Sequence, residues 1–232
     1  MNSWSPQILF EDNHLLVVNK APGEICQGDK TGDEPLPEKL KAFLKEREEK
    51  PGNVFLGVVH RLDRPVSGVV ILAKTSKALE RMNAQIRDRE IEKTYWAIVS
   101  KRPDPSEGRL EHWLAKDQAN NKSRIVREGT SGAKLAILNY SLRASLERYH
   151  LIEVSLETGR HHQIRVQLSA IGCPVRGDLK YGSQRSNEDG SVSLHAARLR
   201  FVHPVRKETI EVKAPPPPDP LWRLFLKALG ES

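Results

Sequence analysis

One carboxylate stands between two arginines in the stretch His60-Arg61-Leu62-Asp63-Arg64. Guanidinium groups on both sides favour the ionised form of Asp63. An ionised carboxylate can act as a nucleophile or as the partner of a cation, whereas a general acid needs the protonated form. The residue types alone also allow a purely structural alternative, in which Asp63 accepts backbone N–H groups in a turn.

The residues after Asp63 predict how it is held. Pro65 and the pair Ser67-Gly68 are typical of turns. They lead into the continuous apolar run Val69-Val70-Ile71-Leu72-Ala73, which is typical of a strand covered on both faces. We therefore expect Asp63 in or beside a turn at the edge of a buried strand.

Apolar patterns along the rest of the chain predict more strands than helices. We expect strands at 8–10, 15–18, 91–99, 135–142, 149–156, 194–201 and 208–213, and helices at 37–50, after 75, at 163–171 and near 221–229. Residues 108–114 and 123–126 bracket a polar stretch, 115–122, expected to be an exposed excursion, and 178–191 should form an irregular loop. Because the helices are inserted between strands rather than alternating with them, we predict an α+β fold with helices packed on a large mixed, mainly antiparallel sheet.

Length and charge limit the possible classes of protein. A chain of 232 residues is most simply one domain, 1–232, and its formal charge of +7 favours a polyanionic partner. No apolar run is long enough to cross a bilayer, and the first residues do not resemble a secretory signal, so we expect a cytoplasmic protein.

The sequence offers no pattern typical of a metal or cofactor site. Cys26 and Cys173 are isolated from each other, and we expect both to be free thiols. The neighbouring His161 and His162 lack a third ligand at a suitable spacing. Because there is also no glycine-rich phosphate loop, we predict a reaction without metal or cofactor.

Four motifs, in this order, resemble those of the RluA-type RNA pseudouridine synthases. They are the stretch from His60 to Lys74 with its H-R-L-D and S-G, the segment 92–99 (EKTYWAIV), the segment 158–165 (TGRHHQIR), and the final block 194–204 with its LHAA and FVHP. The resemblance covers nearly the whole chain. It departs from the family at Pro65-Val66, where Asp-Thr is usual. We expect no N-terminal S4 RNA-binding module, since about sixty residues precede the first motif.

The resemblance implies a uridine isomerase acting on a flipped base in structured RNA. Asp63 would attack C1′ or remove the 2′ proton, two routes between which the sequence does not choose. Arg165 would pair with Asp63. A tyrosine within a strand usually serves packing, but by resemblance Tyr95 would stack on the target base and help to remove the C5 proton. Arg61 would fill the space left by that base.

The partner implied by the resemblance is a stem-loop of ribosomal or transfer RNA, bound by a monomer without cofactor. We predict RNA contacts from basic residues near the motifs and in the excursion: His60, Arg61, Arg64, Lys122, Arg124 and Arg160. For Lys20 two alternatives stay open, an RNA contact or a solvated lysine.

Two other classes of function remain open from the sequence. The chain could be an RNA-binding module without chemistry, although a buried Asp–Arg pair would then be a costly feature. It could also be a glycoside hydrolase, which needs a second carboxylate. Glu153 and Glu157 are the candidates for that carboxylate in the later motifs.

Overall fold

The computed structural model describes residues 4–29, 31–49 and 51–230, and it divides into two compact units. The first comprises Met1–Ile91 and Ala196–Pro216, and the second Glu92–His195 and Pro217–Ser232. Each unit combines antiparallel strand pairs with helices, and the predicted α+β class is confirmed. That the two units act as one catalytic domain stays a prediction.

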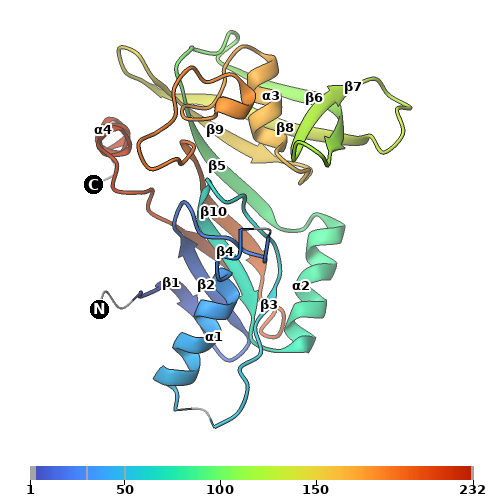
Figure 1. Cartoon of the computed structure of the whole chain (residues 1–232), viewed down its shortest axis with the longest axis vertical. Coiled ribbons are helices and arrows are strands. Elements are labelled where there is room, and N and C mark those ends of the chain that lie inside the picture. The colour runs from blue at the N-terminus through green and yellow to red at the C-terminus, as the bar shows by residue number, and fades with distance from the viewer. Residues whose placement is uncertain (1–3, 30, 50, 231–232) are drawn as a thin grey trace. The chain divides into compact units, whose positions relative to one another are not determined.

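The first unit is built around strand β4, which is buried at every residue. Antiparallel pairings join β1 to β2, β2 to β4, and β3 to β4 (Figure 1). Another antiparallel pairing joins β10 to β11. The elements are β1 (Gln7–Glu11), β2 (Leu15–Lys20), α1 (Leu36–Arg47), β3 (Gly57–Val58), β4 (Ser67–Ala73), α2 (Ser76–Asp88), β10 (Leu194–Val202), which enters this unit at Ala196, and β11 (Thr209–Lys213). The predicted strand after Asp63 is therefore confirmed, and so is its burial.

Helix α2 closes one side of the first unit's core (Figure 1). Thr75 caps the helix by accepting a hydrogen bond from the Ala78 amide, as its position before the apolar stripe predicts. Ala78 and Met82 enter a cluster with alternate residues of the strands, among them Leu15, Val17, Val69 and Ile71. Alternation puts these strand residues on one face, so β2 and β4 are held rigidly beside the turn that carries Asp63.

The second unit holds antiparallel strands in the order β5-β9-β8-β6-β7. Its elements are β5 (Glu92–Val99), β6 (Glu107–Asp117), β7 (Lys122–Val126), β8 (Lys134–Ser145), β9 (His150–Leu156), α3 (Gln163–Ala170), the 3₁₀ helix η1 (Leu179–Tyr181) and α4 (Pro220–Leu229). Helix α4 packs Trp222 and Phe225 against Ile98 and Leu151. Helix α3 packs near β6 and β7, and the predicted 135–142 and 149–156 hairpin is confirmed.

Most residues of the predicted excursion at 115–122 are exposed, but its irregular part is shorter than predicted. Strand β6 continues to Asp117 and β7 starts at Lys122, so only residues 118–121 form the turn, in which Asp117 accepts a hydrogen bond from the Asn120 amide. Antiparallel pairing satisfies backbone groups whatever the side chains are, and polar residues are tolerated where a strand faces water. Polarity alone therefore misplaced the strand ends.

Among the described residues, no helix is long and apolar enough to cross a membrane. Cys26 and Cys173 are both free and buried.

Candidate active site

A tight turn in the first unit presents Asp63, as the sequence predicts. The Asp63 carbonyl accepts the Val66 amide at 3.0 Å, and β4 begins at the next residue. Upstream, the half-buried His60 ring accepts the Ile71 amide through Nε2 at 3.2 Å. Both sides of the turn are thus tied to β4, and the half-buried Asp63 side chain is held at its edge.

Gly68 shows why the Ser-Gly pair follows the carboxylate. Its φ is +121°, and a Cβ at this position would lie 2.3 Å from the Ala196 carbonyl oxygen and 2.5 Å from the Ala196 nitrogen. Only glycine fits, because the interfering atoms are backbone. The close approach joins β4 to β10, and so brings the first motif against the final one.

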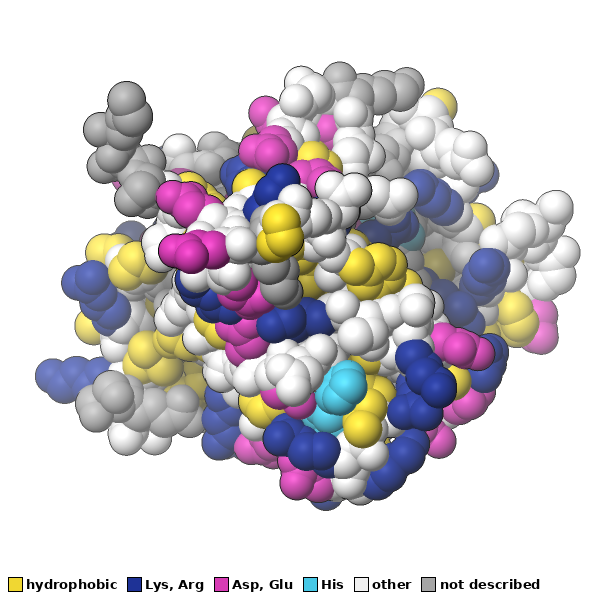
Figure 2. Space-filling model, turned by 90° about the horizontal axis from the view of Figure 1, so that it is seen from below, with side chains coloured by type: hydrophobic (Ala, Val, Ile, Leu, Met, Phe, Trp, Pro, Cys, Tyr) yellow, Lys and Arg dark blue, Asp and Glu magenta, His cyan; other side chains and the backbone are white. Residues whose placement is uncertain are grey.

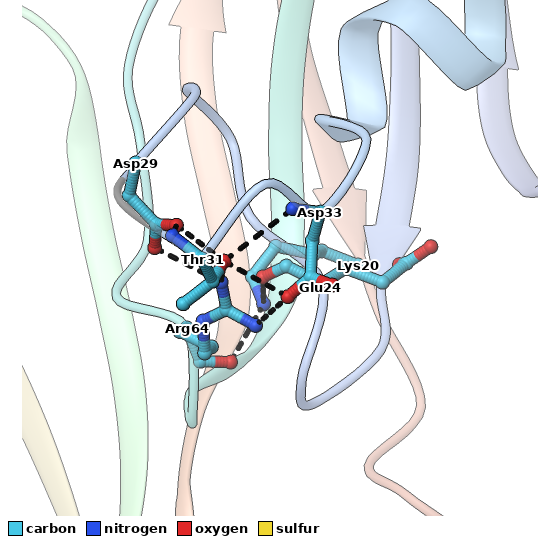
Figure 3. Close-up of polar contacts among 6 residues, drawn as sticks. All are labelled: Lys20, Glu24, Asp29, Thr31, Asp33 and Arg64. Carbon is cyan, nitrogen blue, oxygen red and sulfur yellow. Dashed lines mark hydrogen bonds and ion pairs between the residues drawn. The ribbon is translucent and has the colours of Figure 1, made fainter.

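Both alternatives for Lys20, an RNA contact and a solvated lysine, are wrong. Its side chain is directed into the protein and makes its contacts there. It is fully buried, and Nζ donates to the Ala21 carbonyl oxygen at 2.9 Å. Nζ also donates to the carbonyl oxygens of Glu24 at 2.8 Å and Arg64 at 3.2 Å (Figure 3). Burial lowers its pKa to about 8, against the opposing effect of nearby acidic groups that include Asp63. Lys20 therefore fixes the backbone directly after Asp63.

Arg64 is held by an acidic loop. Its guanidinium donates to Asp33, to Asp29 Oδ2 at 2.9 Å and to Thr31 Oγ1 at 2.6 Å (Figure 3). These ion pairs hold the pKa values of Asp33 and Asp29 below their usual range, with the Thr31 hydroxyl as the larger cause at Asp29. The neighbouring Arg61 is exposed and donates to Gln27 Oε1 at 2.9 Å. RNA contacts by the two arginines stay predictions.

In the second unit, Arg165 has a partner that the sequence analysis missed. From the first turn of α3, Nε donates to Asp178 Oδ2 at 2.6 Å and Nη2 to Oδ1 at 2.8 Å. The two side chains are only 5% and 1% exposed, and Cζ lies 5.2 Å from the Tyr181 ring centre. A buried guanidinium requires a carboxylate partner. Asp178, an acidic residue at the start of the loop 178–191, could have been considered as that partner from the sequence. The Asp63 pairing stays a prediction.

Tyr95 lies within β5 and is 8% exposed, opposite Val154 of β9. The next residue, Trp96, is opposite Glu153 and donates to its carboxylate at 3.3 Å. Since successive side chains of a strand alternate, Tyr95 and Trp96 lie on different faces, as predicted. The Tyr95 role in stacking stays a prediction.

The two adjacent histidines join α3 to the β6–β7 hairpin. Ser123 Oγ donates to the His161 carbonyl at 2.6 Å, and His162 Nδ1 lies 2.8 Å from the Tyr181 hydroxyl. Burial, with a smaller effect of Arg165, lowers the pKa of His162 to about 2. Within the described ranges, no three His, Cys, Asp or Glu residues are arranged to hold a metal ion.

The remaining predicted RNA contacts lie near this hairpin. Lys122 and Arg124 are exposed on β7, and Lys122 Nζ is 5.1 Å from the Tyr181 ring centre. Arg160 is half-buried and donates from Nε to the Leu135 carbonyl at 2.9 Å. On the face in Figure 2, basic side chains are interspersed with acidic ones, so positive charge there is not gathered in one patch.

The two glutamates that could serve a glycoside hydrolase are engaged elsewhere. Glu153 receives the Trp96 indole N–H and lies 3.6 Å from Arg143. Glu157 accepts from Arg109 at 3.3 Å and from Asn139 at 2.9 Å. Such surface contacts are typical of structural carboxylates rather than of a catalytic pair.

Known proteins resemble this chain along most of its length. The profile of the RNA pseudouridylate synthase family matches residues 14–170. Ribosomal large subunit pseudouridine synthase D of Zymomonas mobilis is 35% identical, over 96% of this chain and 72% of the relative. Ribosomal large subunit pseudouridine synthase C of Pasteurella multocida is 35% identical, over 97% and 68%. The solved structure of human RNA pseudouridylate synthase domain containing 4 is 25% identical, with a TM-score of 0.78 over 97% of this chain and 93% of that one.

Proposed function

The chain belongs to the RNA pseudouridylate synthase family, an isomerase family acting on RNA, and we propose that it isomerises uridines of ribosomal RNA with Asp63, Tyr95 and Arg165 as catalytic residues. The observation that carries the proposal is that the family match, 14–170, contains all three residues. Ribosomal RNA is proposed because relatives at 35% identity are named for the large ribosomal subunit.

Asp63 is the residue on which the reaction depends in this proposal. Whether it attacks C1′ or removes the 2′ proton, the carboxylate must be ionised. The bond from C1′ to N1 then breaks, the uracil turns, and C1′ bonds to C5. The C5 proton leaves and N1 gains one, so the product is an isomer of the substrate. The turn that Lys20 and β4 hold rigid supports this role, since a nucleophile must be positioned closely.

Tyr95 and Arg165 have the environments that their proposed roles need. The two-point pair with Asp178 fixes the orientation of the Arg165 guanidinium. A fixed, permanently charged group can keep a catalytic carboxylate ionised, which supports the proposed pairing with Asp63. In the proposal, the ring of Tyr95, which β5 holds in place, would stack on the flipped base. In this proposal, the two units act together as one catalytic domain.

RNA binding is proposed to use basic side chains from both units. These are His60, Arg61, Arg64, Lys122, Arg124 and Arg160, with Arg61 filling the space that the flipped base leaves. Arg61, Lys122 and Arg124 are exposed, which supports direct phosphate contacts.

The substrate can be tested by mapping pseudouridine directly. The protein is incubated with unmodified large-subunit ribosomal RNA and with tRNA transcripts, followed by carbodiimide labelling and primer extension. We expect new stops in ribosomal RNA, absent with Asp63→Asn and present with the control Lys101→Met, which changes an exposed lysine. Stops only in tRNA would replace ribosomal RNA by a tRNA stem-loop as substrate. No stop in either RNA from folded protein would contradict the proposed reaction.

A further inference from the structure

Lys93 is a half-buried cation on a strand, without a hydrogen-bond or ion-pair partner among the described residues. It lies on β5, two residues before Tyr95, and desolvation lowers the pKa of its ammonium group. Among residues 4–29, 31–49 and 51–230, none forms a hydrogen bond or an ion pair with Lys93 Nζ. Partial removal of a charge from water without a partner costs free energy, and a bound anion offsets this cost.

The position of Lys93 points to a ligand beside Tyr95. Alternation along β5 puts the two side chains on the same face. Lys93 Nζ lies beside Gly159, where an added Cβ would be 3.8 Å away. Gly159 belongs to the turn that leads into α3 and Arg165. The ammonium therefore lies close to the backbone that positions a proposed catalytic residue.

Neither the acidic residue next to Lys93 nor the one just before the Gly159 turn neutralises Lys93. Glu92 is adjacent on the strand, so its side chain leaves from the other face. Glu157 precedes the Gly159 turn, but its carboxylate accepts hydrogen bonds from Arg109 and Asn139. Desolvation lowers the Lys93 pKa, and no described carboxylate forms an ion pair with its ammonium group. An anion that pairs with Lys93 would therefore come from outside the chain.

We propose that Lys93 binds a backbone phosphate of the RNA next to the uridine that stacks on Tyr95. The inference rests on the proposed function and names a further substrate contact of the same site. A flipped nucleotide brings its flanking phosphates to the protein surface, and an ammonium with little water around it binds a phosphate more strongly than a hydrated one does. Lys93 is a positioning residue here, since it holds the target nucleotide and takes no part in bond breaking.

The proposal is tested with Lys93→Met, Lys93→Arg and the exposed control Lys101→Met, measured by tritium release from RNA containing 5-tritiated uridine. For Lys93→Met we expect KM to rise roughly ten- to a hundredfold with kcat little changed, as for the loss of a charged hydrogen bond. Lys93→Arg should restore most of the affinity, and Lys101→Met should match the native protein. The slope of log affinity against log salt should fall by about 0.7 in Lys93→Met.

Thermal unfolding separates this role from a structural one. Lys93→Met removes an unpaired charge, so we expect its melting temperature to equal or exceed that of the native protein. An unchanged KM and salt slope would overturn the proposal. So would a loss of kcat that Lys93→Arg does not restore, because a neutral amine would then be acting as a base. If the native protein releases no tritium, the proposed function fails, while the salt slope of RNA binding still tests the phosphate contact.

Discussion

Arg64, next to the predicted catalytic Asp63, and Arg165, itself a predicted catalytic residue, form carboxylate pairs of opposite character. Arg165 and Asp178 make a two-point pair with side chains 5% and 1% exposed. Arg64 contacts Asp29 and Asp33 with its own side chain 34% exposed and that of Asp33 60% exposed. The same pairing chemistry therefore occurs in a dry and in a wet environment.

The difference in exposure indicates which arginine can exchange its carboxylate partner for another anion. Breaking the Arg165–Asp178 pair would leave a charge buried without compensation, so this pair must stay complete in the folded protein. Water and salt can replace each partner of Arg64, so its pairs cost little to break. We infer that the buried pair organises the catalytic residue, while the exposed pairs can give way to an RNA phosphate.

The largest expected effect tests the buried pair. Asp178→Asn should lower the free energy of unfolding by about 3–5 kcal/mol, because it strands the Arg165 guanidinium in the interior. Urea denaturation gives the value, and Asp33→Asn is the matched control on an exposed pair. A loss in Asp178→Asn no larger than in the control would show that burial does not distinguish the two pairs.

The next effect concerns pH and the buried His162 beside the Tyr181 hydroxyl. The pKa of His162 is about 2 in the folded protein, against about 6.5 for a free histidine. Below pH 6.5 the unfolded chain takes up a proton that the folded chain refuses, so stability falls as pH falls. From pH 6.5 to pH 5 this loss is about 2 kcal/mol.

The measurement is urea denaturation at several pH values, with His162→Gln as the comparison. The native protein should lose more stability than the variant between pH 6.5 and pH 5. Parallel pH profiles for the two proteins would mean that another group causes the acid sensitivity.

The smallest effect concerns the exposed pairs. Asp29→Asn combined with Asp33→Asn should leave the free energy of unfolding within experimental scatter, since both groups are in contact with water. RNA affinity should rise a few-fold at low salt, because Arg64 loses competing carboxylates. The gain should disappear when Arg64→Gln is added. An equal gain without Arg64 would assign the effect to net charge alone.

Sequence reasoning succeeded where neighbours in the chain determine the structure. The apolar run at 69–73 predicts the buried β4, and Thr75 predicts the start of α2. It failed for Lys20, which binds three backbone carbonyls, because carbonyls carry no sequence signature. It missed Asp178 because a buried arginine requires an acid without indicating which one. The proposed catalytic residues come from motif resemblance, since residue types alone also allow structural roles for Asp63 and Tyr95.

The most direct test of the account is tritium release from ribosomal RNA containing 5-tritiated uridine, with native protein and Asp63→Asn side by side under single-turnover conditions. Bond formation at C5 must free the hydrogen there, so release reports isomerisation itself. We predict release by the native protein and none by Asp63→Asn, although the variant folds and binds the RNA. Equal release by the two proteins would contradict the central role of Asp63.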